Sequence, residues 1–528
     1  MIDHTGIDTD NAPFQLLWKT LHQTSNPIFL TGKAGTGKST FLRYICSHTK
    51  KRYVVLAPTG IAAVNVKGMT IHSFFKLPFR PILPGDPDFS MKGGRIYNTL
   101  KYSQEKQKII KKAELFIIDE ISMVRADILD ALDMILRAYA DRNQPFGGKQ
   151  LLFVGDLFQL EPVVKADQRA ILGAFYNSPF FFDAKVFSQL PLIPIELKKV
   201  YRQEEPEFVE TLDQIRFGSK LKEALATINT RVVAPERTLD EEYVVQLSTR
   251  RDAVDFTNSR RLAILKGEQV NFLGKVEGIF NENNLPTDKK LSLKVGAQVI
   301  FIKNHLEKKW YNGTIGKIQE IGEEFISVEL DSGIKVRVEE EKWSNVKYSY
   351  DEEKKEIVEE EVGSFVQLPI KLAWAITIHK SQGLTFDRVN IDLAGGAFAS
   401  GQTYVALSRC RSLNGMLLTT PIQPRDVIIN PRVVEFMNHT NNEQLIKEQM
   451  LLSQSKKDLL DALYAWRSGD ILNCTNLLFP VILKFPHLFT EKVKRFIRME
   501  LVKQQLKSRG LQKDIDLLKV KIDQYINS

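Results

Sequence analysis

The chain has 528 residues, 43% of them hydrophobic and 26% charged, and its formal net charge at pH 7 is +9. That length exceeds what one hydrophobic core usually organises, so we expect at least two domains. No apolar run is long enough to cross a membrane, the N-terminus does not resemble a signal peptide, and the three cysteines lie too far apart for a zinc site or a disulfide framework. The composition thus argues against membrane and disulfide-rich secreted proteins and predicts a cytoplasmic one, whose basic balance permits a nucleic-acid partner without proving it.

The first strong motif along the chain is Gly-x-x-x-x-Gly-Lys-Ser, from Gly32 to Ser39. The apolar "IFLT" before it predicts a buried strand, and "STFLRYI" after it predicts the start of an amphipathic helix. In such a loop, glycines let backbone N–H groups wrap around a triphosphate while the helix N-terminus adds positive charge. Lys38 would reach the β- and γ-phosphates, and the Ser39 hydroxyl would bind Mg²⁺. The expected nucleotide contacts are Gly32, Ala34, Gly35, Thr36, Gly37, Lys38, Ser39 and Thr40.

Two segments after this loop end in groups that suit a phosphodiester backbone. "VVLAPTGIAA" (54–63) predicts a strand that runs into a helix start, and "TIHSFF" (70–75) follows it. Hydroxyl, imidazole and backbone N–H groups can hold a nucleic-acid strand without reading its sequence. Phe74 either stacks on a base or belongs to the core, and the sequence leaves both open. The candidate strand contacts here are Pro58, Thr59, Gly60, His72, Ser73 and Phe74.

Two more apolar runs end in polar groups that could complete a hydrolytic site. "AELFIIDEISMV" (113–124) ends its apolar run at Asp119 and Glu120. Asp119 would hold Mg²⁺ through its water shell, and Glu120 would polarise the attacking water. "KQLLFVGDLFQLEPV" (149–163) contributes Gln159, whose amide could bond a γ-phosphate oxygen. Strand ends with merely solvated polar groups are the alternative, but downstream of a phosphate loop the pattern favours an NTP-hydrolysing site.

The second half of the chain repeats the Thr-Ile-His of residues 70–72. Within "WAITIHKSQG" (374–383), the groups that could hold a strand are Thr377, His379, Lys380, Ser381 and Gln382. Before it, residues 285–368 alternate in short segments divided by turn residues, which predicts a small β-barrel. After about residue 431 the pattern is helical, and the basic stretch 491–510 could contact nucleic acid, a protein partner or neither.

The order of these motifs resembles that of superfamily 1B helicases, and most closely that of the PIF family of 5′-to-3′ DNA helicases. The resemblance is carried by "GKAGTGKST", "LAPTGIAAVNVKGMTIHSFF", "IIDEISMV", "FVGDLFQLEPV", "VYRQ", "AITIHKSQGLTFDRV" and "YVALSRCRS", which run from about residue 28 to 415. The stretch "DILDALDMILRAYADRNQPFGGKQ" (127–150) is similar to the signature that separates this family from other superfamily 1 branches.

The resemblance implies an α/β fold with two RecA-like domains and ATP with Mg²⁺ in the cleft between them. The first domain would span residues 1–190 and carry a small wedge subdomain at 76–110, for which a plain surface excursion is the alternative. The second would comprise residues 191–284 and 369–430, interrupted by an SH3-like domain at 285–368. Residues 431–528 would form a helical appendage outside the family's core pattern.

The resemblance also assigns roles to individual residues. In the first domain, Lys38, Glu120 and Gln159 would be catalytic. From the second, Arg202 in "VYRQ" and Arg409 in "YVALSRCRS" would stabilise charge on the transferring phosphoryl group. Two further nucleotide contacts are expected: Gln15 with the adenine, and Gly383 in the second domain.

The function implied is an ATP-dependent helicase that moves 5′ to 3′ on single-stranded DNA and unwinds duplex or structured DNA during replication, repair, recombination or telomere-type maintenance. It would act in a bacterial cytosol or nucleoid, with a possible protein partner at the C-terminal region and no membrane contact. Two rival interpretations are an NTPase that switches a protein partner and a nucleic-acid scaffold with a degenerate motor. The complete set of catalytic residue types argues against the second rival.

Overall fold

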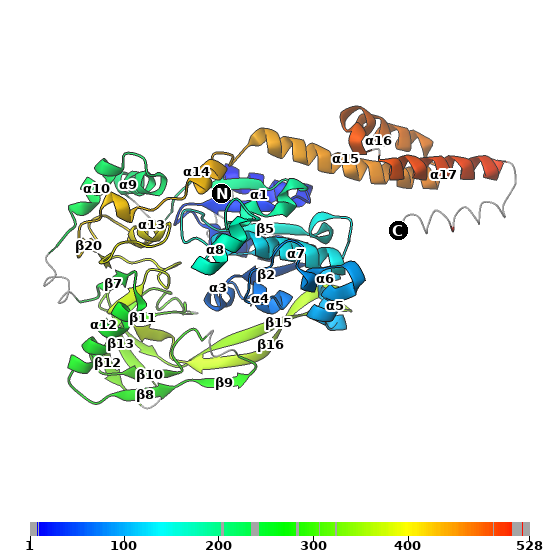
Figure 1. Ribbon diagram of the computed structural model, residues 1–528. Helices are drawn as coiled ribbons and strands as arrows, with labels where there is room; N and C mark the ends of the chain where they lie inside the picture. The colour runs from blue at the N-terminus through cyan, green and yellow to red at the C-terminus, as the bar shows by residue number, and fades with distance from the viewer. Residues whose placement is uncertain are drawn as a thin grey trace. The chain divides into compact units, whose positions relative to one another are not determined.

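A six-stranded parallel sheet organises the first part of the chain (Figure 1), in the order β3-β2-β4-β5-β1-β6. Its strands are β1 (Ile28–Gly32), β2 (Tyr53–Ala57), β3 (Met69–Thr70), β4 (Leu115–Ile118), β5 (Gln150–Val154) and β6 (Ile193–Leu197). Every residue of β1, β4 and β5 is buried, which explains why these strands are unbroken apolar runs in the sequence. Because the strands are parallel, their carboxyl ends lie at one edge of the sheet, where ligands of such sheets usually bind.

The structure is a computed structural model that describes residues 8, 10–201, 205–233, 242–280, 285–305, 307–322, 325–488, 490–508 and 520. The chain divides into two compact units, Met1–Trp18 with Asn26–Asn441 and Lys19–Ser25 with Asn442–Ser528. Along the first sheet the helices are α1 (Ala12–Gln23), α2 (Lys38–His48), α3 (Gly60–Asn65), α4 (Ile71–Phe75), α5 (Arg95–Leu100), α6 (Gln104–Lys112), α7 (Ala126–Tyr139) and α8 (Ala166–Gly173). Short 3₁₀ turns are η1 (Pro87–Phe89), η2 (Lys92–Gly94), η3 (Ile121–Met123), η4 (Pro145–Gly148), η5 (Phe181–Asp183) and η6 (Lys185–Ser188).

A second parallel sheet follows, in the order β18-β7-β19-β20. Its strands are β7 (Val245–Ser248), β18 (Ala375–Thr377), β19 (Val389–Asp392) and β20 (Met416–Leu418). Its helices are α9 (Pro206–Phe217), α10 (Leu221–Asn229), α12 (Arg251–Ile264), α13 (Gln402–Leu407) and α14 (Pro431–Met437), with a 3₁₀ turn at η8 (Pro424–Asp426). Two parallel sheets joined through helices confirm the predicted α/β class.

The residues between β7 and β18 form antiparallel β-structure with a core of its own. Its strands are β8 (Val270–Leu273), β9 (Lys275–Gly278), β10 (Lys290–Leu293), β11 (Gln298–Phe301), β12 (Ile315–Ile321), β13 (Ile326–Leu330), β14 (Lys335–Val338), β15 (Glu341–Asp351), β16 (Glu356–Gln367) and β17 (Ile370–Leu372). They pair as β14-β13-β12-β11-β17, β15-β16-β9 and β10-β8. These strands span residues 270–372, more than the predicted 285–368, and the domain boundaries themselves stay predictions.

The long β15–β16 hairpin reaches from this β-structure to α6 and to the first sheet (Figure 1), in agreement with ion pairs from Lys347 and Lys108 to acidic residues across the contact. At its centre, the buried Tyr348 hydroxyl accepts the Val55 N–H at 3.1 Å and donates to the Val55 carbonyl at 3.2 Å. The Tyr348 side chain therefore supplies the hydrogen-bond partner for both the N–H and the carbonyl of Val55.

The second unit contains the helices α15 (Glu443–Ser468), α16 (Ile471–Lys484) and α17 (Glu491–Ser508), with a short turn at η9 (Pro486–Leu488). Gly469 ends α15 in the left-handed conformation at φ 85°, and the Asp470 side chain caps α16. The "SGD" stretch (468–470) therefore ends one helix and begins the next. Among the described residues, no helix combines the length and the apolar character that a membrane crossing requires.

Tyr348→Phe should lower the free energy of unfolding by about 1–3 kcal/mol, because it leaves the Val55 N–H and carbonyl buried without a partner. Denaturant unfolding followed by circular dichroism measures the change. Tyr350→Phe is the matched control on the same strand, since the Tyr350 hydroxyl has no hydrogen-bond partner among the described residues. Equal stability of the two variants would contradict the role assigned to the Tyr348 hydroxyl.

Candidate nucleotide site and strand-binding segments

The loop between β1 and α2 has the shape of a phosphate cradle. Gly35 and Gly37 adopt φ 81° and 84°, conformations that favour glycine, and Gly37 lies directly before α2. A Cβ atom on Gly32 would lie 2.6 Å from the Thr36 hydroxyl and 2.8 Å from the Leu197 carbonyl, so only glycine fits there. The Lys38 ammonium donates to the carbonyls of Gly32 at 2.6 Å and Lys33 at 3.0 Å, which holds it across the loop.

A cavity of 320 Å³ opens beside this loop. It is lined by Ala34, Gly35, Thr36, Gly37, Lys38, Ser39, Thr40, Asp119, Glu120, Gly155, Asp156, Gln159, Tyr201, Gly383 and Arg409. The lining comes from the phosphate loop, from the carboxyl ends of β4 and β5, and from the segments that follow β18 and α13. Gln15 is exposed and does not line the cavity, so its contact with adenine stays a prediction. Arg202 lies outside the described residues.

The oxygen donors of the cavity fit a magnesium ion. The Ser39 hydroxyl and the Asp119 carboxylate are hard oxygen ligands of the kind that Mg²⁺ prefers, and both line the space in which the triphosphate would lie. Burial raises the pKa of Asp119, and the neighbouring Lys38 ammonium opposes that rise. A bound divalent cation would favour the ionised carboxylate for the same electrostatic reason.

Glu120 is held in a strained backbone conformation at the end of β4. Its φ of 50° and ψ of 43° are uncommon for a residue with a side chain, and strain of this kind is concentrated at functional sites. Burial, helped by the negative charge of Asp119, raises the pKa of Glu120 to about 7, while Lys38 and Arg409 act in the opposite direction. A carboxylate with a raised pKa inside a phosphate cavity is suited to accept a proton from water.

Gln382 joins the two sheets at this carboxylate. Its side-chain amide donates to Glu120 Oε2 at 2.9 Å and to Gln159 Oε1 at 3.2 Å. The sequence placed Gln382 among the strand-holding groups because it follows the second Thr-Ile-His, and no sequence signal pointed to Glu120. The contact is long-range, since the two residues are separated by 262 positions.

Arg409 is a buried cation that faces the cavity without a counter-anion. It follows α13, is 1% exposed, and donates to the carbonyls of Val405 at 3.0 Å and Leu384 at 3.2 Å. Among the described residues it forms no ion pair with a carboxylate, and burial lowers its pKa. A desolvated guanidinium in this position is suited to a phosphate ligand.

Arg216 on α9 forms a second buried link that the sequence did not reveal. Its guanidinium donates to Asp156 Oδ1 at 2.9 Å and to Glu196 Oε1 at 3.3 Å, and Asp156 itself lines the nucleotide cavity. Nearby, the Tyr404 hydroxyl of α13 accepts the Ala34 N–H of the phosphate loop at 3.3 Å. An arginine on an amphipathic helix looks like a surface residue in sequence, so only the fold identifies this one.

The two Thr-Ile-His segments share a capping threonine and then differ, since residues 71–75 form α4 and residues 378–383 form turns. Thr70 ends β3 and its hydroxyl accepts the Ser73 N–H at 3.2 Å; Thr377 ends β18 and its hydroxyl accepts the Lys380 N–H at 3.2 Å. Both strands are edge strands of their sheets. The repeated threonine therefore caps a turn at the carboxyl end of a strand, and the histidine after it is half-buried in both copies.

Two predicted strand contacts are wrong. Phe74 is 0% exposed and packs edge-to-face against Phe75 and Phe116, so its ring is part of the core and cannot stack on a base. Ser381 is also fully buried, and its hydroxyl donates to the Ile378 carbonyl at 2.8 Å. Apolar packing and a local turn account for these two residues.

The other strand contacts stay predictions. Ser73 and Lys380 are exposed and His72 and His379 are half-buried. Pro58, Thr59 and Gly60 are half-buried at the start of α3, where the Thr59 hydroxyl accepts the Ala62 N–H at 3.2 Å.

Comparisons with known proteins agree with this geometry. A family model described as PIF1-like helicase matches residues 12–224. The ATP-dependent DNA helicase Pif1 of Bdellovibrio bacteriovorus is 31% identical over 80% of this chain and 91% of its own length. The ATP-dependent DNA helicase PIF1 of Emericella nidulans is 32% identical over 82% of this chain. The crystal structure of Bacteroides sp Pif1 in complex with ADP-AlF4 is 39% identical with a TM-score of 0.75, and covers 81% of this chain and 96% of that one. Bacteroides Pif1 bound to ssDNA gives 39% identity, a TM-score of 0.58, and 82% and 97% coverage.

This chain belongs to the PIF1-like helicase family. Its two parallel sheets are accordingly the cores of two RecA-like domains, as the sequence predicted. The chain spans 63% of the length of the Emericella nidulans relative and 64% of the Xenopus laevis one, which are longer proteins.

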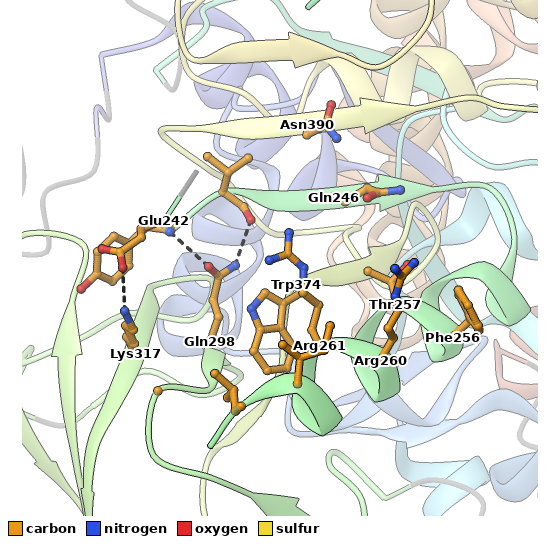
Figure 2. Close-up of a pocket in the computed structure, with 15 residues that line it drawn as sticks. Glu242, Gln246, Phe256, Thr257, Arg260, Arg261, Gln298, Lys317, Trp374 and Asn390 are labelled. Atoms are coloured by element: carbon orange, nitrogen blue, oxygen red, sulfur yellow. Dashed lines mark hydrogen bonds and ion pairs between the residues drawn. The ribbon is translucent and has the colours of Figure 1, made fainter. Parts of the chain in front are cut away.

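A larger cavity of 460 Å³ lies elsewhere in this PIF1-like chain, between α12, the second sheet and the β-structure inserted into it. Figure 2 shows Arg260, Arg261 and Trp374 around it, with Gln298 hydrogen-bonded at one end. Its sheet residues belong to the first half of β7 and β19, so it lies at the opposite edge from Thr377. It contains no phosphate loop and none of the predicted site residues, which separates it from the nucleotide site.

Gly401→Ala should disturb the nucleotide site although Gly401 does not line the cavity, because the added methyl group would clash with the backbone of Gln159. Gly401 precedes α13 with φ 79°, and a Cβ atom there would lie 2.1 Å from the Gln159 carbonyl oxygen and 2.5 Å from that of Phe158. We expect a loss of about 1–3 kcal/mol in unfolding free energy and a several-fold lower rate of ATP hydrolysis, because α13 must move away. Gly395→Ala is the control for backbone strain without a steric clash, since Gly395 has φ 91° and no atom lies within 4 Å of an added Cβ. Similar losses in both variants would show that backbone strain alone is responsible.

Proposed function

We propose that this chain is an ATP-dependent DNA helicase that moves 5′ to 3′ on single-stranded DNA and unwinds duplex ahead of it. The observation that carries this proposal is one cavity lined by the phosphate loop and the Asp119–Glu120 pair of one domain and by Arg409 of the other. Gln382, next to the lining residue Gly383, donates to Glu120 from the second domain. The family's members named above are DNA helicases, and one is known bound to ssDNA. The direction of movement is supported by the family resemblance.

The chemistry follows from the residues around the cavity. Backbone N–H groups of the loop and the Lys38 ammonium bind the triphosphate, and Glu120 orients the attacking water and accepts its proton. Arg409 stabilises charge at the transferring phosphoryl group from the second domain. Mg²⁺, when bound by Ser39 and Asp119, neutralises charge on the phosphate oxygens.

Coupling between hydrolysis and the strand runs through the second Thr-Ile-His segment. His379 and Lys380 are in place to hold the strand, and Gln382 in the same short segment contacts Glu120 and Gln159. If a change at the γ-phosphate moves Gln159, Gln382 transmits the movement to His379, which lies three residues before it in the chain. ATP binding and release would bias two arrangements of this contact, which is the requirement for a ligand-driven cycle.

We also propose a cytosolic site of action and a protein contact at the helical unit. Among the described residues, Cys46 and Cys474 are free thiols, which suits a reducing compartment. In the helical unit, large apolar side chains are more than half exposed, and such groups commonly mark contacts with other proteins. They are Leu460, Tyr464, Leu472, Phe479 and Leu483.

Unwinding of one duplex that bears either a 5′ or a 3′ single-stranded tail tests the proposal. We expect ATP-driven unwinding of the 5′-tailed duplex only, and none by Glu120→Gln, which should still bind ATP and DNA because it keeps the shape of the side chain. Unwinding of the 3′-tailed duplex alone would reverse the direction. ATP hydrolysis that single-stranded DNA fails to stimulate would favour a nucleotide switch for a protein partner.

Gln382→Leu should uncouple the strand from hydrolysis. The variant removes both hydrogen bonds to the cavity while it keeps a side chain of similar bulk. We expect DNA to stimulate ATP hydrolysis at least several-fold less, with ATP affinity close to wild type, in a steady-state assay with and without DNA. Gln214→Leu is the matched control, since this half-buried amide donates only within α9, to Glu210, among the hydrogen bonds of the described residues. Normal stimulation in Gln382→Leu would remove this residue from the coupling path.

A further inference from the structure

Two exposed phenylalanines stand beside the two Thr-Ile-His segments, and neither was singled out by the sequence. Phe79 is 89% exposed and Phe398 is 67% exposed. The Phe79 ring stacks on His72 with centroids 4.9 Å apart and an interplanar angle of 5°. The Phe398 ring stacks on His379 at 6.4 Å and 20°. Single exposed apolar residues are common, but the same pairing at both copies of one motif requires a reason.

The loop that carries Phe79 is braced by charge and by proline. Pro78 and Pro81 flank the segment, and Arg80 binds Asp86 and, at 2.7 Å, Asp88. The backbone around Phe79 is therefore restrained although its ring faces solvent.

A hydrogen bond to a buried side chain restrains the backbone of Phe398. Its N–H donates at 3.0 Å to the side-chain oxygen of Gln402, which is completely buried in α13. An aromatic ring that is restrained before its ligand arrives loses little conformational entropy on binding, so both positions are prepared for contact.

We propose that Phe79 and Phe398 are base-stacking platforms, one on each RecA-like domain, for the unpaired bases of a single nucleic-acid strand. The proposal rests on the function proposed above and specifies that the protein contacts the bases of the strand as well as its phosphates. Each pair has one half-buried ring, the histidine, and one exposed face, that of the phenylalanine, on which a base can extend the stack. Stacking accepts any base, so it suits a protein that moves along DNA of arbitrary sequence.

The exposed polar neighbours of each platform complete a strand site. Ser73 follows His72 and Lys380 follows His379, and both side chains are exposed next to the stacked rings. A hydroxyl or an ammonium beside an aromatic face can hold the phosphate of the nucleotide whose base is stacked. Phe79 and Phe398 thus replace Phe74 as the proposed stacking rings, because Phe74 is buried in the core.

Comparison of a base-bearing strand with an abasic one tests the platforms directly. The probes are a fluorescein-labelled oligodeoxythymidine and an abasic strand of equal length and charge, and fluorescence anisotropy measures both affinities. We expect the wild-type chain to prefer the base-bearing strand. Phe79→Ala and Phe398→Ala should each reduce that preference about fivefold or more, and the double variant should lose most of it.

Three controls separate stacking from other effects. Phe79→Trp and Phe398→Trp should retain the preference, because tryptophan also presents an aromatic face. Phe256→Ala removes a ring that is 65% exposed on α12, away from both histidines, and should bind both strands as the wild type does. The salt dependence of binding should be unchanged in the phenylalanine variants and shallower in Lys380→Ala, since only the latter removes a cation.

Equal affinity of the wild-type chain for both strands, or a full preference in the double alanine variant, would overturn the platforms and leave the helicase proposal standing. A wild-type chain that binds neither strand would overturn the proposed function, and this inference with it.

Discussion

The hydrogen bond from Gln382 to Glu120 is the contact on which the arrangement of the site depends. Glu120 lies at the end of a buried strand in a strained backbone conformation, and burial of its carboxylate beside the cavity raises its pKa. An amide from the other sheet supplies the donor that such a carboxylate requires. Because that amide belongs to the segment that also carries His379 and Lys380, the contact with Glu120 and the strand contacts proposed above share one short stretch of backbone. Neither RecA-like domain contains a complete site by itself.

A buried ion-pair network joins α9 of the second domain to residues of the first. Arg216 lies between Asp156 and Glu196 with no exposed side-chain surface, and such a network loses several kcal/mol if one partner is removed, because the remaining charge stays desolvated. Gly401 allows the start of α13 to approach the backbone of Phe158 and Gln159 closely. These two contacts position α13 and so place Arg409 at the cavity, where it donates to carbonyl oxygens and, among the described residues, forms no ion pair.

The paired Thr-Ile-His segments show how a short repeated sequence yields a repeated device. In each, the threonine hydroxyl ends an edge strand and accepts the N–H three residues on, which caps α4 in the first copy and a turn in the second. The exposed ring against each histidine comes from a different part of the chain, a proline-flanked loop in one domain and the segment before α13 in the other. The two histidines therefore have the same kind of aromatic neighbour although the segments that supply it differ.

The sequence by itself determined the elements whose chemistry is local. A phosphate loop, the Asp119–Glu120 pair, Gln159 and the alternation of strands and helices depend on residue type and spacing within about ten positions, so the α/β class and most of the nucleotide cavity were predictable. Tertiary structure decided the rest, because burial and long-range contact are properties of the packed chain. It removed Phe74 and Ser381 from the strand site, since apolar packing around β4 and a turn at Ile378 enclose them. It also brought Gln382 to Glu120, Arg216 to Asp156 and Phe398 to His379, contacts between segments whose separation along the chain carries no sequence signal. Phe79 is close to His72 in sequence, but the stacking of the two rings depends on the path of the loop between them.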